Sequence, residues 1–76
     1  MNRSNIAFSN LRAEMGRKNI TIGSVASLLG KTRDTASNKL ARKTPINLDE
    51  AFAIKNAFFP SHSIEYLFSE IFNDTG

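Results

Sequence analysis

Four polar side chains that could read the edges of DNA bases lie within six positions, at Arg33, Asp34, Ser37 and Asn38. Arginine pairs bidentately with guanine, asparagine with adenine, and aspartate accepts from the cytosine amino group, while serine can serve a base or a phosphate. At 100° per residue of an α-helix, Asp34, Ser37 and Asn38 fall on one side, and Arg33 projects from the first turn. The set therefore predicts a polar helix face suited to the major groove.

Two short helices with a glycine turn between them are needed to present that face. Thr21 is in place to cap a helix within residues 22–29, and Gly30 supplies the left-handed residue that ends it. Thr32 can then cap the second helix, which reaches residue 40 or 41. This helix-turn-helix, at about residues 22–41, lets the second helix project into a DNA major groove.

Three further helices are expected around this unit, at about residues 5–18 with Ser4 as N-cap, at about 47–57, and at about 63–72. The second of them starts with Asn47 and Glu50 in a capping-box arrangement. The apolar side chains expected to face inward are Phe8, Leu11 and Met15; Val25, Ala26, Leu28 and Leu29; Ala36 and Leu40; Leu48, Phe52 and Ile54; and Ile64, Leu67, Phe68, Ile71 and Phe72. The predicted fold is all-α, a compact bundle of about five short helices that forms one domain over residues 1–76.

Basic residues are concentrated in the first part of the chain. Residues 1–43 hold nine lysines and arginines against two acids, a balance of +7, whereas residues 44–76 hold one lysine against five acids, a balance of −4. The whole chain carries +3 with a pI of about 9.7, which suits a polyanionic partner, although ordinary solubility charge explains it as well. The candidate phosphate contacts are Arg42, Lys43 and Thr44 directly after the second helix, with Arg17 and Lys18 as further candidates.

Other classes of function find little support in the residues. The chain has no cysteine and only one histidine, His62, so neither a metal site nor a cofactor is expected. No nucleophile–base pair or phosphate-binding glycine loop indicates an enzyme. No apolar run approaches the roughly 20 residues of a membrane span, and no signal peptide is recognisable, so the cytoplasm is the expected location.

The chain also resembles a known family. Residues 35–70 read TASNKLARKTPINLDEAFAIKNAFFPSHSIEYLFSE, which is similar to short phage-encoded members of the lambda-repressor-like (Cro/CI or XRE) family. The resemblance covers residues 8–72 and implies five helices with the helix-turn-helix at the second and third. It further implies an operator-binding transcription regulator, usually dimeric on DNA. The base contacts that it implies are Thr32, Arg33, Asp34, Ser37 and Asn38, with phosphate contacts near Lys43.

Two functions remain open at this point. The first is a sequence-specific repressor or Cro-like switch protein that occupies an operator through its recognition helix. The second is an antirepressor-type interaction module that uses the same fold to bind a partner repressor instead of DNA. The acidic second half favours the second function, as do Ile22 and Ala36, which depart from the family pattern.

The Phe-rich C-terminal segment allows two interpretations. Its aromatic side chains could all belong to the core of so small a domain. Alternatively, part of the last apolar stripe remains uncovered and forms a partner surface. The candidate homodimer contacts on that stripe are Tyr66, Phe68, Ile71 and Phe72.

Overall fold

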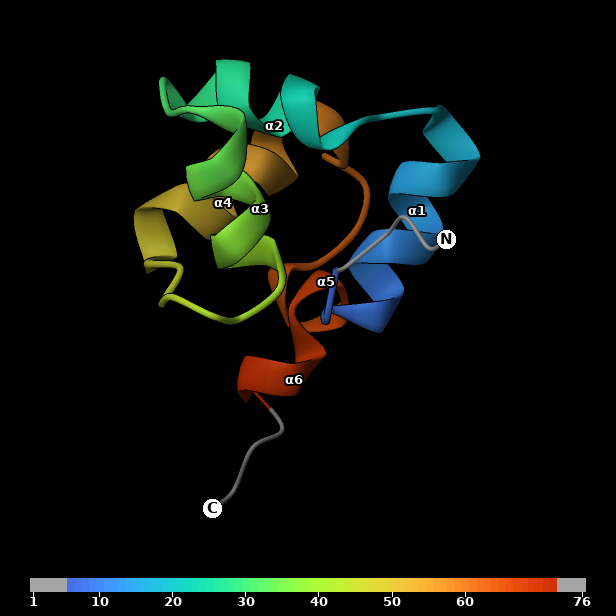
Figure 1. The fold of residues 1–76 in the computed structure, drawn as a ribbon. Coiled ribbons are helices and arrows are strands. Elements are labelled where there is room, and N and C mark those ends of the chain that lie inside the picture. Colours follow the sequence, from blue (N-terminus) through green and yellow to red (C-terminus); the bar gives the residue numbers. More distant parts are fainter. Residues whose placement is uncertain (1–5, 73–76) are drawn as a thin grey trace.

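The computed structural model describes residues 6–72, which form helices without any strand (Figure 1). The helices are α1 (Ser9–Lys18), α2 (Ile22–Leu29), α3 (Arg33–Leu40), α4 (Leu48–Phe58), α5 (Ile64–Leu67) and α6 (Ser69–Phe72). The predicted all-α class is thus confirmed for the described part of the chain. No helix in this part is long and apolar enough to cross a membrane.

Side-chain caps start four of these helices, where the sequence places residues suited to capping. Thr21, Thr32 and Ser63 each accept a hydrogen bond from the backbone N–H three residues further on, at 3.1, 3.2 and 3.1 Å. At the start of α4, the Asn47 side chain accepts from the Glu50 N–H at 2.9 Å, and the Glu50 carboxylate accepts from the Asn47 N–H at 3.1 Å. The predicted capping box is therefore confirmed.

Gly30 ends α2 in the left-handed conformation that the sequence predicts, with φ 67° and ψ 32°. A Cβ added there would meet no atom within 4 Å, so replacement by Ala costs only backbone strain. We expect Gly30→Ala to lower the free energy of unfolding by about 1 kcal/mol. The matched control is Gly16→Ala inside α1, where the Cβ also has free space and a gain of about 1 kcal/mol is expected. Urea unfolding of both variants checks this; a change of the same sign in the two would contradict it.

The first helix begins at Ser9, four residues later than expected. The residue before it, Phe8, has extended backbone and is completely buried. Just upstream, the N–H of Ala7 donates to the Leu40 carbonyl at 2.9 Å, which ties this extended segment to the end of α3. The chain remains extended there because this bond and the burial of Phe8 outweigh an additional helical turn. The predicted N-cap, Ser4, lies outside the described residues.

The expected C-terminal helix over residues 63–72 is broken into α5 and α6 at Phe68. The Asn10 side-chain amide donates to the Tyr66 carbonyl at 2.9 Å and so occupies an oxygen that a continuous helix would use itself. The break turns the Phe68 ring inward against the core. Ile71, which a single regular helix would place on the same buried stripe, is left 40% exposed.

One core joins all the longer helices. Its largest completely buried side chains are Phe8, Phe59, Phe68, Leu11, Leu40, Ile54, Leu67 and Val25. On α4 the buried positions are Ala51 and Ile54, so the predicted inward orientation of Leu48 and Phe52 is wrong: they are 50% and 41% exposed. Leu28 on α2 is also exposed rather than buried. α2 and α4 thus bury a narrower stripe than their apolar patterns suggest, because few neighbours surround each helix in so small a domain.

Candidate nucleic-acid interface

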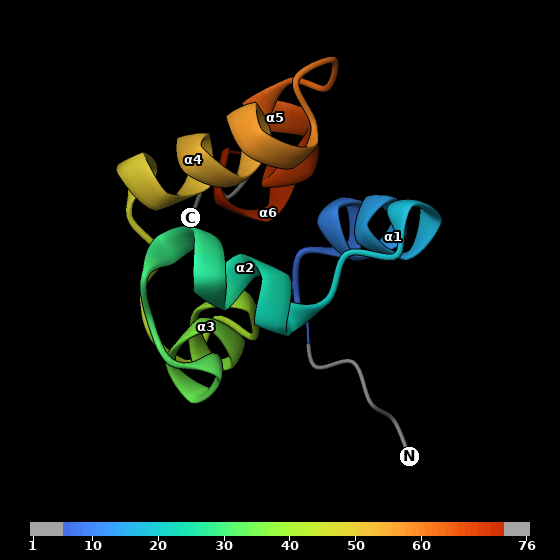
Figure 2. The same ribbon diagram turned by 90° about the horizontal axis from the view of Figure 1, so that it is seen from above.

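The helix-turn-helix places α3 at the edge of the molecule. Figure 2 shows α2 lying between α3 and α4, with α5 on the far side from α3. Ala36 and Leu40 are buried and pack α3 against the rest of the fold, as the sequence predicts. The opposite side of α3 is therefore free to face a partner.

That outer side brings together four of the five predicted base contacts. Arg33, Asp34 and Asn38 are exposed, and Ser37 is half-buried. Among residues 6–72, no hydrogen bond or ion pair engages these four side chains. Their donors and acceptors are thus available to base edges without the loss of any internal contact.

The fifth predicted base contact, Thr32, has a structural role at the start of α3. Its hydroxyl oxygen accepts from the Thr35 N–H at 3.2 Å and donates its proton to the Thr35 hydroxyl at 2.9 Å. The hydroxyl is therefore largely committed to capping the helix. A DNA contact by Thr32 would have to use its methyl group or the remaining lone pair.

A tight turn after α3 fixes the predicted phosphate contacts. The Asn38 carbonyl accepts from the N–H groups of Lys43 and Thr44, at 2.9 and 3.3 Å. Arg42 lies in the left-handed region, with φ 63°, at a cost of about 1–2 kcal/mol for a residue with a Cβ. Its guanidinium lies over the Phe8 ring, 5.6 Å from the centroid. All three candidates are exposed at the C-terminal end of α3.

The neighbouring Lys39 helps to anchor this turn rather than projecting from it. Its ammonium donates to the Pro45 carbonyl at 3.2 Å and lies 3.2 Å from the Glu50 carboxylate. The pair joins the last turn of α3 to the first turn of α4, and both side chains are mostly covered. It fixes the direction in which the chain leaves α3.

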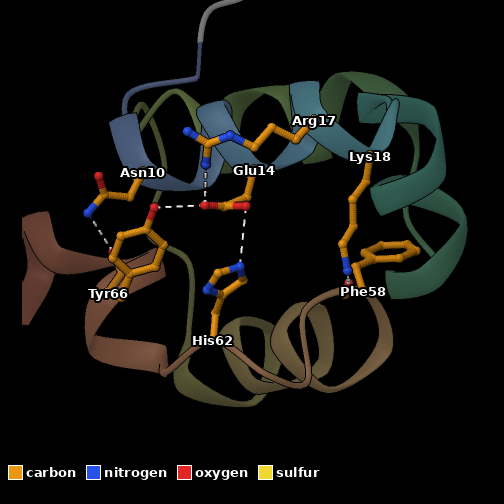
Figure 3. A network of polar contacts seen from close by, with 7 residues as sticks. All are labelled: Asn10, Glu14, Arg17, Lys18, Phe58, His62 and Tyr66. Atoms are coloured by element: carbon orange, nitrogen blue, oxygen red, sulfur yellow. Dashed lines mark hydrogen bonds and ion pairs between the residues drawn. The ribbon is translucent and has the colours of Figure 1, made fainter.

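The other two predicted phosphate contacts, Arg17 and Lys18, are not brought to this surface. The Arg17 guanidinium pairs with Glu14. The Lys18 ammonium donates to the Phe58 carbonyl at 2.9 Å and lies 5.3 Å from the centroid of the Phe59 ring. The Lys18 head group is thus held at the end of α4, whereas the Arg17 side chain, 65% exposed, runs back along α1 to Glu14 (Figure 3).

The surface around α3 keeps its positive charge. Arg33, Arg42 and Lys43 are exposed, and the ion pairs found in residues 6–72 involve other side chains. Asp34 is the one acidic residue on α3. An internal pairing of these three cations would have favoured the interaction-module interpretation, and no such pairing occurs among the described residues.

A second constellation, missed by the sequence analysis, surrounds Glu14 (Figure 3). The Tyr66 hydroxyl donates to its carboxylate at 2.8 Å, the His62 Nε2 lies 3.3 Å from the other oxygen, and Arg17 pairs with the first. Glu14 is 6% exposed, although a glutamate is normally expected to face solvent. Because both oxygens are occupied, the cluster acts as a clamp between α1 and the segment that contains His62 and α5.

The clamp also sets the charge state of Glu14. The Tyr66 hydrogen bond lowers the pKa of Glu14; burial opposes this, and the charges of Arg17 and His62 add to the lowering. The net result is a carboxylate that stays ionised at neutral pH. The described residues contain no group of three or more potential metal ligands.

The carboxyl groups of Glu50 and Glu70 also have lowered pKa values. Burial works against ionisation of Glu50, but the N–H of Asn47 and the Lys39 ammonium outweigh it, so the pKa of Glu50 is lowered. Burial likewise opposes ionisation of Glu70, and the backbone N–H and hydroxyl of Ser9, both 3.0 Å from one carboxylate oxygen, lower its pKa. Each carboxylate joins two parts of the fold or caps a helix.

These three lowered pKa values predict acid sensitivity. A carboxyl whose folded pKa lies below its ordinary value of 4.5 stabilises the protein fully above that value, and the contribution disappears as the pH falls through the folded pKa. We therefore expect the melting temperature to fall below about pH 4.5. Glu14→Gln should melt well below the wild type at pH 7, and the gap should narrow as the pH falls below about 4.5. A gap between the two that is independent of pH would contradict this.

The candidate dimer contacts are only partly available. Phe68 is 0% exposed, so its predicted place on a partner surface is wrong; the break between α5 and α6 turns it into the core. Tyr66 is partly exposed, but its hydroxyl is bound to Glu14. Ile71 is exposed, and the side chain of Phe72 lies outside the description.

Searches among protein-family models, curated proteins and solved structures found no match to the chain. The functional assignment therefore depends on the residues of this chain and on their arrangement.

Proposed function

We propose that this protein is a sequence-specific DNA-binding transcription regulator of the lambda-repressor-like type that its sequence resembles. The observation that carries the proposal is the outer face of α3. There, Arg33, Asp34, Ser37 and Asn38 are free of internal contacts beside an exposed basic turn. This combination offers base-reading groups and phosphate-binding groups on one side of a projecting helix.

In the proposed complex, α3 enters the major groove of double-stranded DNA. Arg33 pairs with a guanine and Asn38 with an adenine, while Asp34 accepts from a cytosine amino group. Arg42 and Lys43 hold the backbone at the far end of the helix and fix its register. Occupation of an operator in this way blocks transcription by exclusion of the polymerase, and no cofactor is required.

A second candidate function is supported by a different surface. Leu48, Phe52 and Ile71 are large apolar side chains that remain exposed. An antirepressor-type module would use such side chains to bind a partner repressor, and a homodimer would use them to bind a second copy. DNA binding remains the first candidate because the apolar side chains lie away from the uncommitted polar face of α3.

The direct test is selection of duplexes from a random library, followed by binding measurements over a range of salt. We expect enrichment of one sequence and a steep fall in affinity with salt, with a slope of about −0.9 per phosphate neutralised. The variant with both Arg42→Ala and Lys43→Ala should bind more weakly and lose about two units of that slope. Arg12→Ala, which removes one exposed charge from α1, is the control for the loss of charge at another place on the surface. Equal, weak binding to selected and random duplexes would refute operator recognition.

A further inference from the structure

A groove lies between the turn after α3 and the helix α6. Its volume is about 390 Å³, and its apolar wall consists of Phe8, Pro45, Ile46 and Ile71. A second, smaller hollow shares Ile46 and Ile71 with it and continues to Leu48 on α4. The two hollows form one apolar strip, and the large side chains Leu48 and Ile71 are both exposed along it.

Cationic side chains also line the groove. Lys39, Arg42 and Lys43 all border it. The charge of Lys39 is balanced by Glu50, 3.2 Å away, whereas Arg42 and Lys43 form no ion pair with any described residue. Two uncompensated positive charges therefore stand beside an apolar wall.

The left-handed turn holds Arg42 in this position. Its φ of 63° is unusual for a residue with a Cβ, and strain of this kind persists only where the surroundings impose it. The stacked arrangement over Phe8 keeps the guanidinium at the border between the polar and apolar sides. The charge is therefore placed in advance of any binding event, which lowers the entropic cost of holding an anionic partner group there.

We propose that this groove binds a segment of a partner protein that presents an acidic side chain next to an aliphatic or aromatic one. The acidic group would meet Arg42 and Lys43, and the apolar group would cover Ile46, Ile71 and the adjoining Leu48. Charge complementarity and an apolar anchor together match this chemistry. A DNA backbone would pair only with the two cations and would leave the apolar strip exposed to water.

The proposal concerns a surface other than the outer face of α3 and does not require DNA binding. One consequence does rest on the proposed function. Arg42 and Lys43 are also its phosphate contacts, so an acidic partner in the groove would compete with DNA for the same two side chains. Such a partner would relieve repression by release of the operator.

The test uses the full chain to select binders from a displayed library of random peptides. We expect enrichment of peptides with Asp or Glu beside Leu, Ile or Phe. The double variant Arg42→Glu with Lys43→Glu should weaken them by about tenfold or more. Ile71→Ser should also weaken them, whereas Arg12→Glu, a charge reversal at an exposed position of α1, should not. Circular dichroism checks that each variant keeps its helices.

Several results would overturn the proposal. The selection could give no binder, or binders without acidic residues. The selected peptides could bind the doubly charge-reversed variant as well as the wild type, or keep full affinity when their apolar residues are replaced by serine. Failure of the selection would leave the salt-dependent DNA binding untouched, so the two proposals fail separately.

Discussion

Replacement of Phe68 by Ala is expected to lower the free energy of unfolding by about 3–5 kcal/mol. The Phe68 ring is completely buried and packs edge-to-face on Phe8, with the centroids 5.0 Å apart. It also stands at the break between α5 and α6, so its removal would leave a cavity where the C-terminal segment meets the extended chain before α1. Since small domains have only about 5–15 kcal/mol in total, the variant should be marginally stable.

Phe52→Ala is the control for this prediction, because it removes the same atoms from a side chain that is 41% exposed on α4. We expect it to cost less than about 1 kcal/mol, as surface substitutions usually do. Urea unfolding of both variants, followed by circular dichroism, gives the comparison. Similar losses in the two would contradict the description of the core, and so would a loss below 1 kcal/mol for Phe68→Ala.

Arg33→Ala and Asn38→Ala are each expected to weaken binding to the selected duplex by about 1–3 kcal/mol, or roughly five- to 150-fold. Each variant removes a bidentate base contact of the proposed complex. Neither side chain has an internal partner among the described residues, so the melting temperature should stay close to that of the wild type. Affinity for random duplexes should change much less than affinity for the selected one.

A comparison of selected with random duplexes separates the loss of a base contact from the general effect of a lost charge. Arg12→Ala also removes one positive charge but lies on α1, and it should affect selected and random duplexes equally and weakly. Asn38→Ala changes no charge at all, so a loss there measures a direct contact. Wild-type affinity in both Arg33→Ala and Asn38→Ala would refute the assignment of α3 as the recognition helix.

Local signals in the sequence predicted much of this fold. The caps at Thr21, Thr32 and Asn47 and the left-handed Gly30 were all predicted correctly, because each depends on residues within one helical turn. The buried positions Ala36 and Leu40 followed from helical periodicity. From these alone, the exposed polar face of α3 could be located.

Three of the failures involve contacts between distant parts of the chain. The late start of α1 depends on a bond from Ala7 to the end of α3, 33 residues further along. The break at Phe68 depends on the Asn10 amide, and burial of Glu14 depends on Tyr66. A periodicity argument places a glutamate such as Glu14 in water, since nothing local indicates the partners that satisfy it.

The candidate site divides in the same way. The proposed base-reading set is local to one helix, and the sequence predicted the exposed face on which it lies. The proposed phosphate set is not local: Arg42 and Lys43 are exposed beside α3, whereas Arg17 pairs with Glu14 on α1 and Lys18 binds the Phe58 carbonyl at the end of α4. The position of each basic residue in the sequence does not show in which direction its head group points.

Amide NMR shifts of the protein during titration with the selected duplex test the central claim most directly. The account predicts the largest changes along residues 32–44, from the start of α3 to the end of the basic turn, with little change along residues 48–68. Changes centred on α4 and α5, or no saturable change with any selected duplex, would contradict the claim that α3 reads DNA.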